Sequence, residues 1–248
     1  MKTSGNTILI TGGATGIGFA LAEAFVKAGN EVIICGRRES KLEEAKKKLP
    51  QLHTLICDVE LPAERVKLFK QSTSQFGKLN ILINNAGIQK AHNFNNADGD
   101  MFADENEITI NLEAPIHLCA LFMEHLKKQA SPAIMNVSSG LGFVPLTFLP
   151  VYCATKAGLH SFTKSLRHQL KISNIKVFEI IPPTVDSELD RGRRGNSYRG
   201  VPATDVSDAT MIGIEKDEYE ITVGESHKFV DAVRNATEQA FQNMNSRH

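Results

Sequence analysis

Tryptophan is absent from the sequence, tyrosine occurs only three times and cysteine only four times. The cysteines show no C-x-x-C spacing and no cluster with histidine, so they indicate neither a zinc site nor a disulfide framework. Reduced thiols in the cytoplasm fit this usage better. His92, His117, His125 and His160 are also scattered at no metal-ligand spacing, and we therefore assign no metal.

Long apolar runs and an excess of charge are also missing. No window approaches the ~20 apolar residues that a membrane-spanning helix needs, and the first apolar run stops too soon, at a glycine turn, to be a signal peptide. Lysine plus arginine and aspartate plus glutamate each total 28, so the formal net charge is zero. Nothing global favours nucleic acid or a membrane surface as a partner. We expect a soluble, cytoplasmic protein.

What is present is a regular alternation of short aliphatic runs with amphipathic segments. This pattern predicts an α/β fold of Rossmann type, with a doubly wound seven-stranded parallel sheet and helices on both faces. Strands are expected at 7–11, 31–35, 53–57, 79–84, 133–138, 176–181 and 219–223. Helices are expected at 17–28, 40–49, 62–76, 102–128, 154–172, 205–215 and 226–243. No linker or internal repeat is visible, so we expect one domain, 1–248.

The stretch "ILITGGATGIGFALAEAF" combines a buried strand, a glycine-rich turn at residues 12–18 and a helix. This order puts backbone N–H groups and the positive end of a helix dipole where a pyrophosphate could bind. Ala14 interrupts the strict G-x-G-x-x-G spacing, and a purely structural turn can use glycine too. Because both the strand and the helix are present, we favour phosphate binding over the structural turn.

The end of the second predicted strand is where an acidic residue would bind the adenosine ribose of NAD. The sequence has Gly36, Arg37 and Arg38 there instead. Two guanidiniums can bind a 2′-phosphate, so NADP(H) is the preferred cofactor and NAD(H) the alternative. An exposed loop whose arginines contact only water is the competing interpretation. Asp58, after the third strand, is a candidate partner for the adenine amino group or an ordinary turn residue.

Tyr152 is the one tyrosine with a lysine, Lys156, four positions later. On a helix the two share a face, and an ammonium beside a phenol favours the phenolate, which can exchange a proton with an alcohol or ketone. Chance produces such a pair in roughly one sequence in five of this composition, so a mere helix surface is the alternative. Ser139 closes the fifth strand at the sheet edge where ligands bind, although serine is common in turns there too.

Taken together, these motifs resemble the short-chain dehydrogenase/reductase family over nearly the whole chain. The family's T-G-x-x-x-G-I-G turn matches residues 11–18, its N-N-A-G segment matches 84–87 and its Y-x-x-x-K matches 152–156. The family's serine lies thirteen residues before the tyrosine, which selects Ser139 rather than Ser138. Four motifs in the family's order make coincidence remote.

The resemblance implies four catalytic residues. Tyr152 would be the general acid/base and Lys156 would favour its phenolate and bind the nicotinamide ribose. Ser139 would orient the substrate oxygen, and Asn111, at the family's helix asparagine, would hold a water that relays protons to Lys156. The resemblance further implies contacts with the cofactor from Gly12, Thr15, Gly16, Ile17, Gly18, Arg37, Arg38, Asp58, Val59, Asn85, Ala86, Gly87, Tyr152, Lys156, Pro182, Val185 and Ser187.

One segment departs from the family pattern. Where the family usually has Pro-Gly after the sixth strand, this chain has "IIPPTVDSEL", with Pro183 in the glycine position. Proline fixes φ and removes a donor, so the loop beside the nicotinamide is expected to differ. The double proline, "GRRESKL" and "EKDEYEITVG" are similar to the DltE-like branch of the family, which is named for an operon of teichoic acid D-alanylation.

Two segments are candidates for the substrate side. The apolar stretch 140–150 either forms a substrate wall or packs in the core or between subunits. A substrate loop is expected near 183–203, and its basic part, 190–200, is either a solvated face or a lid over an anionic ligand.

Two functions follow. The leading one is an NADP(H)-dependent oxidoreductase that interconverts a carbonyl and an alcohol on a small molecule. The alternative is a non-catalytic NADP(H)-binding sensor or regulatory protein, which would not need Ser139, Tyr152 and Lys156 together. The resemblance also implies a homodimer or homotetramer formed through the long helices near 102–128 and 154–172.

Overall fold

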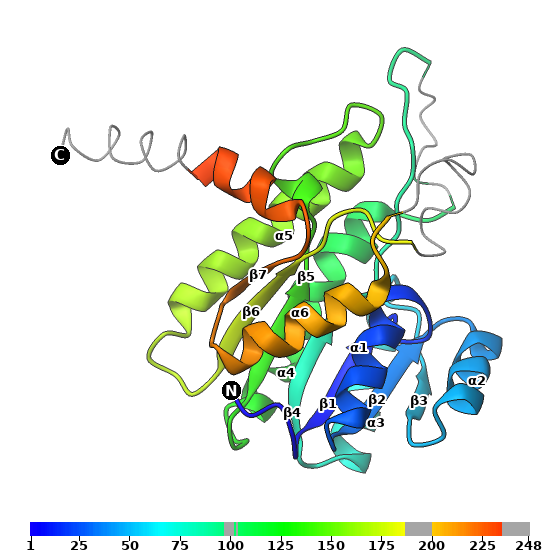
Figure 1. Cartoon of the computed structure of the whole chain (residues 1–248). Helices are drawn as coiled ribbons and strands as arrows, with labels where there is room; N and C mark the ends of the chain where they lie inside the picture. Colours follow the sequence, from blue (N-terminus) through cyan, green and yellow to red (C-terminus); the bar gives the residue numbers. More distant parts are fainter. Residues whose placement is uncertain (97–101, 103, 187–199, 235–248) are drawn as a thin grey trace.

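The computed structural model describes residues 1–96, 102, 104–186 and 200–234. Seven parallel strands form one sheet in the order β3-β2-β1-β4-β5-β6-β7, which confirms the predicted Rossmann-type α/β fold (Figure 1). The strands are β1 (Thr7–Thr11), β2 (Glu31–Gly36), β3 (His53–Ile56), β4 (Leu79–Asn84), β5 (Ala133–Val137), β6 (Lys176–Ile181) and β7 (Glu220–Thr222).

The direction in which strands are added reverses between β1 and β4. From β1 the chain builds outward through β2 to β3, then returns to place β4 on the other side of β1 and continues to β7. In register, Leu9 of β1 lies beside Ile33 of β2 and Leu82 of β4. Connections leave the two central strands in opposite directions, so a crevice opens at their carboxyl ends, where open α/β sheets bind their ligands.

Helices cover both faces of the sheet (Figure 1). They are α1 (Gly16–Lys27), α2 (Glu39–Lys48), α3 (Pro62–Gln75), α4 (Ala114–Leu126), α5 (Pro150–Gln169) and α6 (Ala203–Glu215), and a further helical segment spans 226–234. Alternate strand residues bury into two separate apolar clusters, one beneath α1, α2 and α6 and the other beneath α3, α4 and α5. Burial on both faces explains why the strands are nearly continuous aliphatic runs.

Two predicted helix starts were wrong by four or five residues, and the other starts differ by two residues at most. Helical backbone before α4 begins at residue 107 rather than 102, because Asn106 Oδ1 accepts from the N–H groups of Ile108 and Thr109 and caps the helix there. The helix then passes through a π-turn at Thr109–Glu113. α5 begins at Pro150, four residues earlier than predicted, with proline in its first turn. α2 begins at Glu39 and has no side-chain cap.

A search of the described ranges for a helix long and apolar enough to cross a membrane finds none.

Candidate functional site

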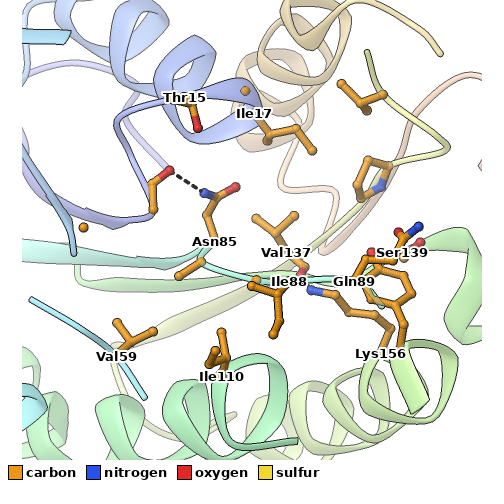
Figure 2. Close-up of a pocket in the computed structure, with 18 of the residues that line it drawn as sticks. Thr15, Ile17, Val59, Asn85, Ile88, Gln89, Ile110, Val137, Ser139 and Lys156 are labelled. Carbon is orange, nitrogen blue, oxygen red and sulfur yellow. Dashed lines mark hydrogen bonds between the residues drawn. The ribbon is translucent and has the colours of Figure 1, made fainter. Parts of the chain in front are cut away.

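A cavity of about 450 Å³ runs along the carboxyl ends of the strands (Figure 2). Its size lies in the range of small-molecule and cofactor sites. Predicted site residues from segments far apart in the sequence come together on its wall: Gly12, Thr15, Gly16, Ile17, Arg37, Arg38, Asp58, Val59, Asn85, Ala86, Gly87, Ser139, Tyr152, Lys156, Pro182 and Val185. Gly18 and Asn111 are described but do not line the cavity, and Ser187 lies outside the described residues.

The glycine turn between β1 and α1 leaves no room for a Cβ at Gly12 or Gly18. Gly12 has φ of +63°, and a Cβ on Gly18 would lie 2.3 Å from the Gly12 carbonyl oxygen. Gly18 therefore serves the tight packing of helix against turn rather than a contact on the cavity wall. Helix α1 has no acidic residue in its first turn and no side-chain cap, so its free N–H groups and dipole are available to an anion in the cavity.

The turn is fastened to the end of β4 by side-chain hydrogen bonds. Asn85 Nδ2 donates to the carbonyl oxygens of Thr11, at 2.9 Å, and Gly12, at 3.1 Å. Figure 2 shows one hydrogen bond from this side chain as a dashed line. The Thr11 hydroxyl in turn accepts from the backbone N–H groups of Asn85 and Ala86, each at 3.0 Å. These bonds cross the reversal point of the sheet, so they hold the two sides of the crevice at a fixed separation.

Positive charge gathers at the end of the cavity beyond β2. Arg37, Arg38 and Lys41 line it together, and Arg37 forms an ion pair with Glu105, which also lines the cavity. Asp58 lies on the same wall, and its Oδ1 accepts from the N–H of Glu60 at 3.0 Å. Asp58 thus makes the local turn that its type favours, while its remaining carboxylate oxygen is left for other partners.

Ser139, Tyr152 and Lys156 lie at the other end of the cavity. Ser139 follows β5 with extended backbone, and its Oγ accepts from the N–H of Leu141 at 3.1 Å. Tyr152 and Lys156 share one face of α5, with Lys156 Nζ 5.7 Å from the centroid of the Tyr152 ring. Gly142 lets the segment after β5 pack closely against α5, because a Cβ there would lie 2.9 Å from the backbone of Lys156.

Lys156 is held by the sheet. Its Nζ donates to the carbonyl oxygen of Val137, the last residue of β5, at 2.9 Å, and Figure 2 shows it reaching from α5 toward that strand. Burial lowers the pKa of Lys156 to about 8, and the negative charge of Glu179 opposes that shift. Near neutral pH the amine is thus charged but gives up its proton more readily than an exposed lysine.

Asn111 lies behind the cavity wall, in the π-turn before α4. Its side chain accepts from the N–H of Ile88 and donates to the carbonyl oxygen of Ile88, both at 2.8 Å, and also donates to the Thr155 hydroxyl at 3.2 Å. The amide therefore fixes the segment after β4 against α5. A Cβ added at Gly87 would lie 3.2 Å from Asn111 Oδ1, so a glycine suits this position beside the amide.

The segment with the double proline stays beside the cavity. Four residues of this segment line the cavity: Pro182, Pro183, Thr184 and Val185. The carbonyl oxygen of Pro182 accepts from the N–H of Gly140 at 3.0 Å.

The apolar stretch 140–150 agrees in part with each of its two interpretations, as a substrate wall or as a packing surface. Leu141 and Leu149 line the cavity, whereas Val144 and Phe148 are exposed. Nearly all of the basic segment 190–200 lies outside the described residues.

The sequence model of one family, described as short chain dehydrogenase, matches residues 6–197. The chain belongs to the short-chain dehydrogenase family. This short-chain dehydrogenase is 45% identical to the protein named uncharacterized oxidoreductase DltE of Bacillus subtilis (strain 168), over 99% of both chains. It is a member of the DltE-like branch of a family of oxidoreductases.

Solved structures agree with the fold. A short-chain dehydrogenase/reductase from Burkholderia phymatum, in complex with NAD, matches with a TM-score of 0.84 at 21% identity, over 98% of this chain and 96% of the other. A short-chain dehydrogenase from Burkholderia cenocepacia J2315, in complex with NADP, matches with a TM-score of 0.82 at 23% identity, over 98% of both.

Several residues of this short-chain dehydrogenase line the cavity but were not predicted. Ile88 and Gln89 directly follow the predicted 84–87 segment, and Lys41 follows the two arginines by one helical turn, so an extension of each motif would have found them. Glu105 gave no signal, because its place depends on an ion pair with a residue far away in the sequence. No group of three or more metal-ligating side chains occurs in the part of the chain that the structure describes.

Proposed function

We propose that the protein is an NADP(H)-dependent oxidoreductase that interconverts a carbonyl and an alcohol on a small molecule. The observation that carries this proposal is the composition of one cavity, with Ser139, Tyr152 and Lys156 at one end and Arg37 and Arg38 at the other. The first group suits proton exchange with a substrate oxygen, and the second suits a phosphate.

The residues at the reacting end have separate roles in this proposal. Tyr152 donates a proton to the substrate oxygen in reduction and accepts one in oxidation. The Lys156 ammonium favours the phenolate and binds the nicotinamide ribose, and the Ser139 hydroxyl orients the substrate oxygen. Asn111 holds the segment after β4 in place and completes a proton relay to Lys156. When bound, the nicotinamide supplies or accepts the hydride.

The wall of the cavity fits a dinucleotide. The first turn of α1 offers N–H groups to a pyrophosphate, and the glycines there let phosphate oxygens approach the backbone. In this proposal Asp58 and Val59 contact adenine, and the nicotinamide half is bound by further residues of the cavity wall, Asn85, Ala86, Gly87, Pro182 and Val185. Ser187 is proposed as a further contact beyond the described residues.

The preference for NADP(H) rests on charge. In this proposal Arg37, Arg38 and Lys41 of the cavity wall bind the 2′-phosphate, and the end of β2, Gly36-Arg37-Arg38, has no carboxylate at the position that would repel it. Glu105 pairs with Arg37, so a 2′-phosphate would compete with that carboxylate for one guanidinium. NAD(H) is the second candidate cofactor.

A regulatory protein that binds NADP(H) without turnover is the second candidate function. The presence of Ser139, Tyr152 and Lys156 on one cavity wall argues against it, because a sensor that only binds the cofactor does not need all three together. Tight NADPH binding without turnover of any carbonyl would support the sensor.

Three further features belong to the proposal. The whole chain, 1–248, forms one NAD(P)-binding domain with a substrate loop near 183–203. It assembles as a homodimer or homotetramer through α4 and α5, where the exposed Ile108 and Ile116 would be covered. It works in the cytoplasm, which suits four buried cysteines that are all free thiols.

The test is NADPH oxidation with a panel of aldehydes and ketones, comparing the wild type with Tyr152→Phe and Tyr219→Phe. Tyr152→Phe should lose turnover by at least about a hundredfold, while calorimetry shows that it still binds NADPH. Tyr219→Phe, which removes a phenol from outside the cavity, should retain turnover. Full activity in Tyr152→Phe would exclude the proposed role of this tyrosine.

A further inference from the structure

A carboxylate is buried in the middle of the sheet, and no role proposed above uses it. Glu179 belongs to β6, where every neighbour in the strand except Lys176 is apolar, and its exposed fraction is 0%. An ionised carboxylate in such a place is costly unless it is paired and hydrogen-bonded. The partners of Glu179 therefore indicate what stabilises it.

Glu179 joins two elements that carry the proposed catalytic residues. Its Oε1 accepts from the Ser138 hydroxyl at 2.5 Å, and its Oε2 interacts with His160 Nδ1 at 2.9 Å. Ser138 directly precedes Ser139, and His160 follows Lys156 by one turn of α5. One buried carboxylate thus connects the strand end at the serine with the helix that bears the tyrosine and lysine.

The two ends of this chain of hydrogen bonds lie in different surroundings. Ser138 lines the cavity, whereas the His160 side chain is 22% exposed and packs against the ring of Phe143 with centroids 4.4 Å apart. Phe143 lies just after the Ser139 segment in the sequence. The segment after β5 is therefore held at both its start, through Ser138, and its end, through Phe143.

The charged side chains near Glu179 have partners of their own, with His160 as the exception that bonds to Glu179. Glu220 lies opposite it on β7 and pairs with Arg167 of α5 and with Arg234. Among Lys156, His160 and Arg167 of α5, only His160 has a hydrogen bond to Glu179. Among the described residues, no carboxylate lies within ion-pair distance of Lys156, which donates to the Val137 carbonyl. The negative charge of Glu179 acts on Lys156 through space.

We propose that Glu179 is a positioning residue, which fixes Ser139 relative to Tyr152 and Lys156 through its hydrogen bonds with Ser138 and His160. This inference rests on the proposed function, since it assigns the support of the same site. The charge of Glu179 raises the pKa of Lys156 against the effect of burial. Its loss would let the lysine deprotonate at lower pH, and the pair of hydrogen bonds would lose its shared acceptor.

The test compares two isosteric substitutions on neighbouring strands, Glu179→Gln and Glu220→Gln. Glu179→Gln has one side-chain oxygen instead of two, so it cannot accept from Ser138 and His160 at separate oxygens. It should lower kcat about tenfold, with little change in the KM for NADPH, because alignment of the reacting groups is disturbed while the cofactor contacts stay. It should also move the alkaline limb of kcat/KM down by about one pH unit. Glu220→Gln, its partner in register on β7, should change neither quantity.

A second pair separates positioning from simple stability. His160→Gln keeps an N–H that can donate to Glu179, whereas His160→Phe removes it. His160→Gln should retain kcat, and His160→Phe should lose it to the same degree as Glu179→Gln. If Glu179→Gln does not fold, the two His160 variants decide the question, and equal activity in them would overturn the proposal. If Glu179→Gln folds, an alkaline limb of kcat/KM that does not shift would overturn it as well.

One readout does not depend on turnover. In protein labelled with 13C at lysine Cε, the Lys156 signal is the one missing from Lys156→Arg, and its titration by NMR gives the pKa of the amine. In Glu179→Gln that pKa should fall below the wild-type value, and an unchanged value would overturn the electrostatic part. If no carbonyl is ever reduced, the proposed function fails while this titration still decides the role of Glu179.

Discussion

Lys156 Nζ donates to the carbonyl oxygen of Val137 at 2.9 Å. This bond fixes the lysine of α5 to the last residue of β5, two positions before Ser139. The two elements that supply the serine and the tyrosine are thus held together before any ligand binds. Preorganisation of this kind is what the proposed proton exchange requires.

The buried Lys156 predicts how activity depends on pH. Burial lowers its pKa to about 8. Below that pH the amine is charged and favours the phenolate of Tyr152, whereas above it the amine is neutral and no longer does so. The profile of kcat/KM, which reports groups of the free enzyme, should therefore fall as pH rises through about 8. Lys156→Arg, charged at all these pH values, should lack this limb.

The two arginines after β2 predict the choice of cofactor. Arg37→Ala and Arg38→Ala should each weaken NADPH binding about tenfold, because each removes a charge-assisted bond to the 2′-phosphate. Binding of NADH should not change. Calorimetry with both cofactors measures this, and Arg167→Ala, on α5 beside Glu220, is the control. Equal losses for NADPH and NADH would contradict the assigned role.

Gly18 predicts a cost in both stability and binding. In Gly18→Ala the new Cβ would lie 2.3 Å from the Gly12 carbonyl oxygen and 2.5 Å from Asn85 Nδ2. Relief of these contacts shifts the turn and should lower the free energy of unfolding by about 2 kcal/mol, with weaker binding of NADPH. Gly77→Ala is the matched control, since its nearest atom lies at 4.0 Å. Indistinguishable denaturation curves for the two variants would refute the close approach.

The hydrogen bonds of Asn111 predict that its replacement lowers both stability and activity, whereas replacement of an exposed asparagine does not. Asn111→Ala removes both hydrogen bonds to the backbone of Ile88 and leaves buried groups unpaired, so unfolding should cost about 2 kcal/mol less. The freed segment lines the cavity, so kcat should fall as well. Asn93→Ala, at an exposed position, should leave both unchanged. A stable, fully active Asn111→Ala would show that this segment is held by other contacts.

Sequence patterns predicted the sheet more accurately than the helices. The aliphatic runs match all seven strands closely because a strand buried on both faces must be apolar throughout. The start of the helix before α4 was placed five residues too early, since Asn106 ends the preceding loop with a cap that apolar spacing does not reveal. At α5, Pro150 was the overlooked sign of a first turn.

Residues of the candidate site likewise fall into those that sequence motifs predicted and those that only the structure revealed. Motif residues such as Thr15, Ser139 and Tyr152 were found because they lie at strand ends or in fixed spacings. Glu105 and Glu179 were not, since each takes its role from a partner that only the folded chain brings near it. For Asn111, the sequence identified the residue, while its hydrogen bonds to Ile88 emerged from the structure.

Transfer of label tests the central claim most directly. NADPH that carries deuterium at the transferring position of the nicotinamide is incubated with a carbonyl compound that the enzyme reduces, and the alcohol is analysed by mass spectrometry. The wild type should place deuterium on the carbinol carbon, and Tyr152→Phe should form almost no labelled alcohol although it binds NADPH. Labelled product from Tyr152→Phe at the wild-type rate, or unlabelled alcohol from the wild type, would contradict the account.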